Sequence, residues 1–268
     1  AVIGRFANRI AGGRASIEGR PVRLSANGDG HHLHGGATGS ARQRWQVESA
    51  GPDHVALGWL SPDGHEGYPG NCRLRATYSL PHAATLRLEL RAETDQPTLV
   101  NLCHHPYFNF SGRPDIFDHH LEIAATHYLV SGPDLIPTGE IRPVGSSPFN
   151  FSRLRPVGHD RPLPGFNNTY RLAGASRSEP AFAARLSLPG GPEMELWTTQ
   201  PGLHLYDAYK LQNGLLGLGK RVYGPHAGLC LEAQGWPDSP NHPHFPSAIL
   251  RPGEIYRQTT DYRFSLAA

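Results

Sequence analysis

Two segments of this 268-residue chain carry side chains suited to proton transfer. NLCHHPYFNF at 101–110 contains His105, and GLCLEAQGWPDSPNHPHFP at 228–246 contains Glu232. A histidine titrates near neutral pH, and burial raises the pKa of a carboxyl group toward the same range, where general acid and base catalysis works best. A Glu and a His that converge from separate strands would form such a pair. The structural alternatives stay open: a hydrogen-bonded core histidine, and a carboxylate paired with a nearby arginine.

The residues around His105 predict how it is presented. Pro106 disfavours the helical conformation for the residue before it, so we expect His105 at a strand or strand end, facing away from His104. Tyr107 and Phe108 offer an apolar wall or a stacking surface for a sugar ring.

An apolar run, Gly228–Leu231, directly precedes Glu232. We therefore expect this carboxyl group at the end of a buried strand, with Trp236 near enough in sequence to be a stacking partner.

The histidines of HHLHGG (31–36) have a spacing that can bind a metal, because His32 and His34 would share one face of a strand. No carboxylate follows at ligand spacing, and the prolines beside His242 and His244 predict a loop there. We expect no metal site. The chain also lacks GxSxG, GxxxxGK[ST] and a GxGxxG before a helix, which argues against the usual esterase, P-loop and dinucleotide-binding classes.

The elements that must position these residues are predicted to be strands. Thr85 to Arg91 alternates leucine with polar residues, which is the period of a half-buried strand. Similar runs lie at 73–80, 120–125, 183–188, 194–199 and 203–208, and turn signals lie at 61–64, 131–134, 188–192 and 251–254. No capped amphipathic helix longer than about ten residues is evident. We predict one all-β domain over residues 1–268, a sandwich or a barrel.

The composition of the chain argues against two classes of partner, nucleic acids and membranes. Lys+Arg number 25 and Asp+Glu 23, so the formal net charge of +2 argues against a nucleic-acid binder, and no apolar run is long enough for a membrane span. The three cysteines are scattered along the chain, and its start, AVIGRFANRI, lacks the pattern of a signal peptide. We expect a cytoplasmic protein with reduced thiols and with no nucleic-acid or membrane partner.

Seven motifs in order resemble the aldose 1-epimerases, or galactose mutarotases: GRFANRIAGG (4–13), HLHGG (32–36), SPDGHEGYPG (61–70), NLCHHPYFNF (101–110), IPTGEI (136–141), TTQPGLHLY (198–206) and CLEAQGWPDSPNHPHFP (230–246). The resemblance implies a large antiparallel β-sandwich, the galactose mutarotase-like supersandwich, with a sugar cleft lined by strand ends and loops. By motif match, the general base falls on Glu232 and the general acid on His105. Substrate-holding positions fall on Arg9, His34 and Asn167.

The resemblance further implies a cofactor-independent isomerase that interconverts the α and β anomers of a free hexose such as galactose or glucose. Ring opening and reclosure need only two proton transfers and orientation. Two alternatives stay open: a non-catalytic carbohydrate-binding domain, and a related isomerase with a shifted substrate. A glycosidase would usually need two facing carboxylates, and only one is well placed.

Two departures from the family pattern affect these expectations. The family usually has Asp-His after Gly-Phe, whereas this chain has Asn167 and Asn168, so we expect altered hydroxyl recognition and a weakened or shifted sugar preference. Family members also carry a segment before the GRFANRI motif, so we expect a sandwich without the usual N-terminal strands. An open sheet edge would invite association. We expect a monomer or a homodimer with a small-molecule sugar as its ligand.

Overall fold

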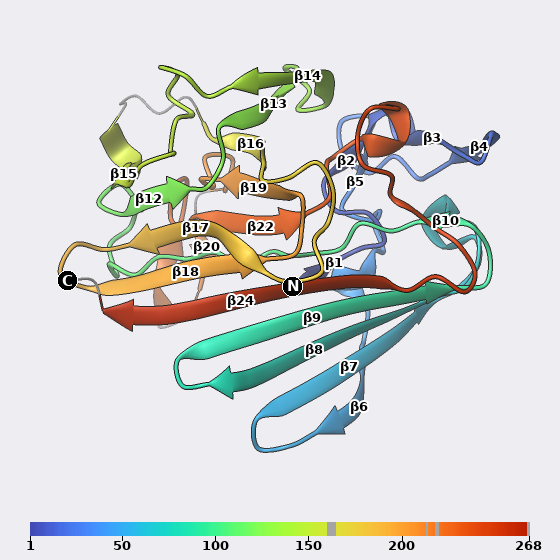
Figure 1. Ribbon diagram of the computed structural model, residues 1–268, viewed down its shortest axis with the longest axis horizontal. Coiled ribbons are helices and arrows are strands. Elements are labelled where there is room, and N and C mark those ends of the chain that lie inside the picture. Colours follow the sequence, from blue (N-terminus) through green and yellow to red (C-terminus); the bar gives the residue numbers. More distant parts are fainter. Residues whose placement is uncertain (160–164, 213, 218–219, 267–268) are drawn as a thin grey trace.

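The computed structural model describes residues 1–159, 165–212, 214–217 and 220–266, and its regular structure is β (Figure 1). Each of the six alternating runs identified above forms a strand, which confirms the all-β prediction. In β9 (Thr85–Thr94), Leu88 and Leu90 are buried while Glu89 is exposed, as the period of two requires. No helix in the described residues is long and apolar enough to cross a membrane.

The larger sheet has nine antiparallel strands in the part of the chain described. In spatial order they are β15 (Arg155–Pro156), β12 (His120–Ile123), β17 (Ala181–Ser187), β18 (Pro192–Thr198), β24 (Tyr256–Leu266), β9, β8 (Cys72–His82), β7 (His54–Ser61) and β6 (Gln46–Ala50). β24 lies at the centre and pairs with β18 on one side and β9 on the other. It therefore joins a half built from residues 120–198 to a half built from residues 46–94.

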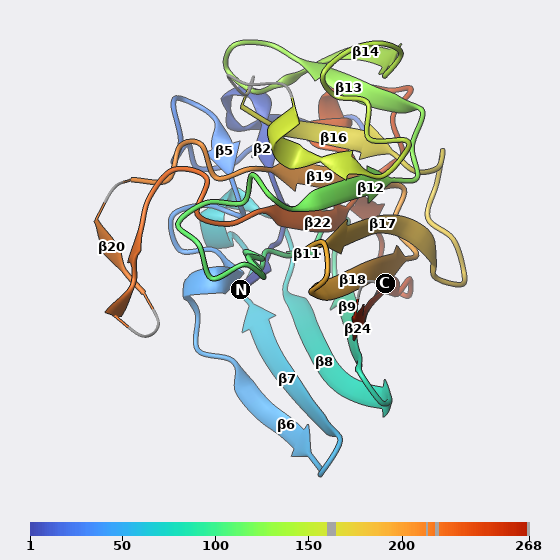
Figure 2. The same cartoon turned by 90° about the vertical axis from the view of Figure 1, so that its left-hand side faces the viewer.

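The second sheet has five antiparallel strands and covers one half of the first (Figure 2). Its order is β14 (Pro137–Pro143), β13 (His127–Ser131), β16 (Asn167–Arg171), β19 (Gly202–Tyr206) and β22 (Cys230–Gln234). Leu203, Leu205 and Leu231 from this sheet pack against Leu186 and Leu196 of the other in one buried cluster. The two sheets therefore form a sandwich around an apolar core.

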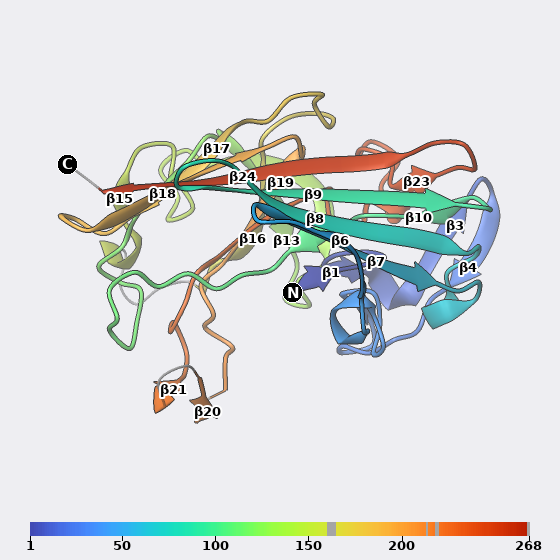
Figure 3. The same cartoon turned by 90° about the horizontal axis from the view of Figure 1, so that it is seen from below.

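Short ribbons complete the described structure. They are β1 (Val2–Ile3) with β11 (Cys103–His104), β2 (Arg9–Ile10) with β5 (His32–Leu33), β3 (Arg14–Ile17) with β4 (Arg20–Arg23), β10 (Thr98–Leu99) with β23 (Ile249–Leu250), and β20 (Leu215–Leu216) with β21 (Val222–Tyr223). The last of these projects away from the sandwich (Figure 3). Single 3-10 turns lie at Ala11–Gly13, Ser40–Arg42, His65–Gly67, Val157–His159 and Ser239–Asn241.

The N-terminal segment is anchored beside the sandwich by Arg5, whose side chain is 2% exposed. Its guanidinium donates to the hydroxyl and carbonyl of Ser61, the carbonyls of Pro62 and Pro69, and the hydroxyl of Thr98. A buried charge requires this degree of hydrogen bonding to remain ionised. Arg5 thereby fixes the chain just before Arg9, one of the predicted site residues.

Candidate active site

The five-stranded sheet has an apolar face toward the core and a polar face toward a cavity. His204 of β19 lies opposite Thr169 of β16 and opposite Glu232 of β22. Because side chains alternate along each strand, these three residues share the face that Leu203 and Leu231 do not occupy. Three adjacent strands thus contribute one polar row.

Segments from the first half of the chain cover this row. β2 contributes Arg9, the residue after β5 is His34, and the segment after β11 contributes His105 and Tyr107. Together they enclose a cavity of about 190 Å³. Its lining residues are Asn8, Arg9, Leu33, His34, His105, Tyr107, Asn167, His204, Tyr206, Lys210 and Glu232. All five residues selected from the sequence therefore lie around one cavity.

Glu232 and His105 are in direct contact. His105 Nε2 lies 3.2 Å from Glu232 Oε1, and the two side chains are 13% and 1% exposed. Glu232 lies in the middle of β22 and not at the strand end expected from the sequence, because residues up to Gln234 continue the pairing with β19. No arginine forms an ion pair with this carboxyl group in the described residues; its second oxygen is 3.6 Å from the Cys103 thiol.

Burial disfavours charge on both members of this pair. It raises the pKa of Glu232 to about 8, against smaller opposing effects of the Cys103 hydrogen bond and of Arg9. It also lowers the pKa of His105 to about 4. Between these limits the pair holds one proton, and the short contact lets that proton move between oxygen and nitrogen. The arrangement can therefore give one proton and accept another without a net change.

His34 is placed by an unusual backbone. Its φ of +54° ends β5 at Leu33 and turns the side chain into the cavity, so His32 and His34 do not share a strand face as expected. His32 Nε2 instead contacts the Tyr68 hydroxyl at 2.6 Å. A Cβ on the next residue, Gly35, would lie 1.8 Å from the Gly4 carbonyl, which explains the glycine after the histidine.

The hydrogen bonds of His34 fix its role as a donor. Its Nδ1 accepts from the Asn8 backbone N–H at 3.2 Å. Burial lowers the pKa of His34 to about 3, so the ring is neutral at neutral pH and its proton lies on Nε2. The ring packs edge-on against that of His105, with centroids 5.5 Å apart. A bound hydroxyl group would therefore meet an N–H donor here.

Asn167 lies beside His204, a residue that the sequence reasoning did not select. His204 Nε2 is 2.9 Å from Asn167 Oδ1, and His204 Nδ1 is 2.9 Å from the Thr169 hydroxyl. Burial holds the pKa of His204 well below its usual value. The neutral ring therefore donates from Nε2 to the amide oxygen and accepts at Nδ1, which leaves the Asn167 NH₂ group to face a ligand.

Arg9 and Tyr107 complete the wall. Arg9 forms no ion pair in the described residues, and burial lowers the pKa of its guanidinium, which still remains charged at neutral pH. Tyr107 stacks on His105 with ring centroids 5.2 Å apart. Trp236, expected as a stacking partner, is instead buried against Phe245. Its indole N–H donates to the Pro201 carbonyl, and Trp236 is not among the residues that line the cavity.

One trio within the site has the composition of a metal site. Ligand atoms of His105, Cys230 and Glu232 lie within 4.8 Å of one another. Burial raises the pKa values of both Cys230 and Glu232, and protonated thiols and carboxyls are poor ligands. The trio is better suited to proton transfer than to holding a cation.

Alternation in TTQPGLHLY would have identified His204. Leu203 and Leu205 fit a core face, so the intervening His204 and the following Tyr206 had to share the opposite face. Asn8 and Lys210 also line the cavity, but strand alternation could not identify them. Asn8 lies in a loop with φ of +62°, and Lys210 lies beyond the end of a strand.

The similarity of this chain to known proteins identifies its family. A profile of the aldose 1-epimerase family matches residues 1–263. The chain belongs to the aldose 1-epimerase family. It is 43% identical to galactose mutarotase of Mus musculus and 33% identical to aldose 1-epimerase of Escherichia coli. These alignments cover 100% and 98% of this chain and 79% of each relative.

Solved structures of family members share the fold. An aldose epimerase homologue from C. elegans superposes with a TM-score of 0.93 at 29% identity, over 100% of this chain and 82% of the other. Galactose 1-epimerase from Lactobacillus acidophilus gives 0.86 at 26% identity, over 100% and 80%. The predicted mutarotase-like sandwich is thereby confirmed.

Proposed function

We propose that this protein is an aldose 1-epimerase that interconverts the α and β anomers of a free hexose without a cofactor. The contact between the largely buried side chains of Glu232 and His105, which both line the cavity, carries the proposal. Mutarotation requires a base at the anomeric hydroxyl and an acid at the ring oxygen. Both oxygens are bonded to the same carbon, so the two catalytic groups must be neighbours, as these are.

The reaction follows from acid and base chemistry. The Glu232 carboxylate takes the proton from the anomeric hydroxyl while His105 Nε2–H protonates the ring oxygen, and the bond from the anomeric carbon to the ring oxygen breaks. The aldehyde end rotates, and reclosure on the other face reverses both transfers. Each positioned group would contribute about 10²–10⁴-fold to the rate. The productive form needs the shared proton on His105, which the 3.2 Å contact allows.

Three residues would hold the sugar. The Arg9 guanidinium can donate to two hydroxyl oxygens at once, and His34 Nε2–H can donate to another. Asn167, oriented by His204, would present its NH₂ group. Tyr107 would cover an apolar face of the ring. A largely donor-lined pocket suits a ligand rich in hydroxyl oxygens.

The residues that line the cavity also argue against two other functions, a glycosidase and a non-catalytic sugar-binding domain. A glycosidase usually places two carboxyl groups about 5–10 Å apart across its substrate, and Glu232 is the one carboxyl group lining this cavity in the described residues. A non-catalytic sugar-binding domain would have no use for a buried carboxyl group in contact with a histidine, because both groups lose solvation there.

Polarimetry on freshly dissolved α-glucose and α-galactose tests the proposal. We expect Glu232→Gln to lower kcat/KM by about 10²–10⁴-fold because it removes the base. Glu93→Gln, an exposed carboxyl group on β9 outside the cavity lining, is the matched control and should retain wild-type rates. Equal rates for the wild type and Glu232→Gln would rule out the enzyme in favour of a binding domain.

We also propose a cytoplasmic location and a monomeric or homodimeric state. The location is supported by three free, buried cysteines in the described chain. Cell fractionation tests the location. Light scattering during size-exclusion chromatography tests the assembly, and a larger oligomer would contradict it.

A further inference from the structure

A row of arginines crosses the nine-stranded sheet on its outer face. Arg75 of β8 lies directly opposite Arg91 of β9, and Arg91 lies directly opposite Arg257 of β24. Like charges placed opposite each other on neighbouring strands destabilise a sheet. The row therefore requires counter-charge from another source.

The protein supplies that counter-charge incompletely. Arg75 Nε lies 3.0 Å from a carboxylate oxygen of Glu48 on β6. Arg91 and Arg257 have no carboxylate within ion-pair distance among the described residues, and Arg91 Nε is buried without a hydrogen-bond acceptor. A buried donor without a partner destabilises the fold. Two adjacent guanidinium groups are thus available to a ligand.

On the same two strands, β9 and β24, another arginine is paired with a carboxylate. Arg87 of β9, four residues before Arg91 and on the same face of the strand, lies opposite Asp261 of β24. Its Nε and Nη2 donate to the two carboxylate oxygens at 2.7 and 2.9 Å. At the position of Arg91 the partner strand offers Arg257 instead of an acid. The excess positive charge is therefore local to one row.

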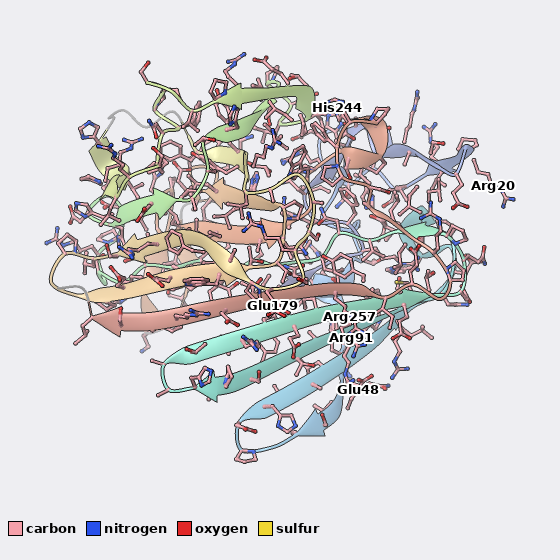
Figure 4. The ribbon with its side chains drawn as sticks, viewed as in Figure 1. Arg20, Glu48, Arg91, Glu179, His244 and Arg257 are labelled. Carbon is pink, nitrogen blue, oxygen red and sulfur yellow. The ribbon has the colours of Figure 1, made fainter. Side chains whose placement is uncertain are left out.

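The row forms the floor of a cavity of about 600 Å³. Figure 4 labels Arg91 and Arg257 beside each other, with Glu48 and Glu179 to either side. Four arginines and one carboxylate, Glu89, belong to the lining. The remaining polar lining offers hydroxyl groups from Ser49, Thr77, Ser178, Thr199 and Thr259 and the imidazole of His54.

We propose that this cavity binds a phosphate group, either inorganic phosphate or the phosphate of a small phosphorylated molecule. A phosphate dianion has enough acceptor oxygens to engage Arg91 and Arg257 together, with bidentate geometry that guanidinium groups favour. It also neutralises two charges at once, and the hydroxyl groups can donate to its remaining oxygens. No residue of this cavity lines the sugar cavity, so the site is separate from the mutarotase site.

Isothermal titration calorimetry at low ionic strength tests the site, because salt screens such charges. The probes are inorganic phosphate, pyrophosphate and a hexose 6-phosphate, each titrated into the wild type, Arg91→Gln and Arg257→Gln. Arg20→Gln, an exposed arginine on β4 outside this cavity, removes the same charge as a matched control. None of the three arginines belongs to the apolar clusters of the core, so the core is unchanged.

We expect saturable binding of at least one probe to the wild type and to Arg20→Gln, with about tenfold weaker binding to each of the other two variants. The probe that binds tightest distinguishes free from esterified phosphate. Glu232→Gln should bind the phosphate probes as the wild type does, so the outcome of this test is independent of the proposed mutarotase activity. Absence of saturable binding, or equal losses in all three arginine variants, would overturn the site.

Discussion

Replacing Asn167 by aspartate tests how this cavity recognises hydroxyl groups. Asn167 is half-buried, and its amide oxygen accepts from His204 Nε2 at 2.9 Å. In Asn167→Asp, one carboxylate oxygen can keep that hydrogen bond while the other accepts from a sugar hydroxyl. The variant therefore exchanges an amide donor for a charged acceptor at one point of the wall.

The size of the effect follows from hydrogen-bond energetics. A neutral hydrogen bond contributes about 0.5–1.5 kcal/mol, and one to a charged group about 1.5–3 kcal/mol. The difference of about 1 kcal/mol corresponds to about a fivefold gain in kcat/KM. Arg9 lines the same cavity and offsets part of the cost of burying the new charge. We expect the gain to differ between glucose and galactose, because their hydroxyl groups differ in orientation.

Polarimetric kcat/KM values for both sugars provide the measurement. Asn168→Asp makes the same chemical change one residue away. Asn168 does not line the cavity, and its Oδ1 accepts from the Asn167 backbone N–H at 3.4 Å. Asn168→Asp should leave both rates within about twofold. Identical kinetics and sugar ranking for Asn167→Asp and the wild type would refute the reasoning that Asn167 contacts substrate.

Two further predictions concern protonation and stability. The pH profile of kcat/KM should be bell-shaped: activity falls below about pH 4, where the His105–Glu232 pair gains a second proton, and above about pH 8, where it loses its only one. Constant activity across the alkaline range would contradict the raised pKa of Glu232. Arg5→Met should lower the free energy of unfolding in urea by at least about 3 kcal/mol, because it leaves several buried acceptors unpaired. Arg14→Met, at an exposed arginine, is the control, and equal stability of the two variants would show that the buried network contributes little.

Strand periodicity made most of the fold predictable. In 85–91 and 203–208 the alternation of leucine with polar residues depends on one buried face, so even the face of each residue could be inferred. The pairing of β24 between β18 and β9 could not, because alternation says nothing about which strand lies beside which.

The position of a site residue was predictable where a sequence motif fixed the local backbone conformation. It was less predictable where tertiary contacts determined the position of the side chain. Pro106 correctly placed His105 at a strand end. His34 was misplaced on a strand face because its φ of +54° ends β5 at Leu33, one residue earlier than expected. Alternation could have placed His204 on the polar face of its strand, but its contacts with Thr169 and Asn167 could not be predicted because those residues are distant in sequence.

The central position of β24 has a consequence for synthesis on the ribosome. Until residue 266 has left the exit tunnel, β9 and β18 each present an open edge with unpaired backbone groups. The cavity residues precede β24 in the chain, so Glu232 and His105 have already emerged by then. From the emergence of β18 until that of β24, the nascent chain therefore exposes two strand edges to intermolecular pairing.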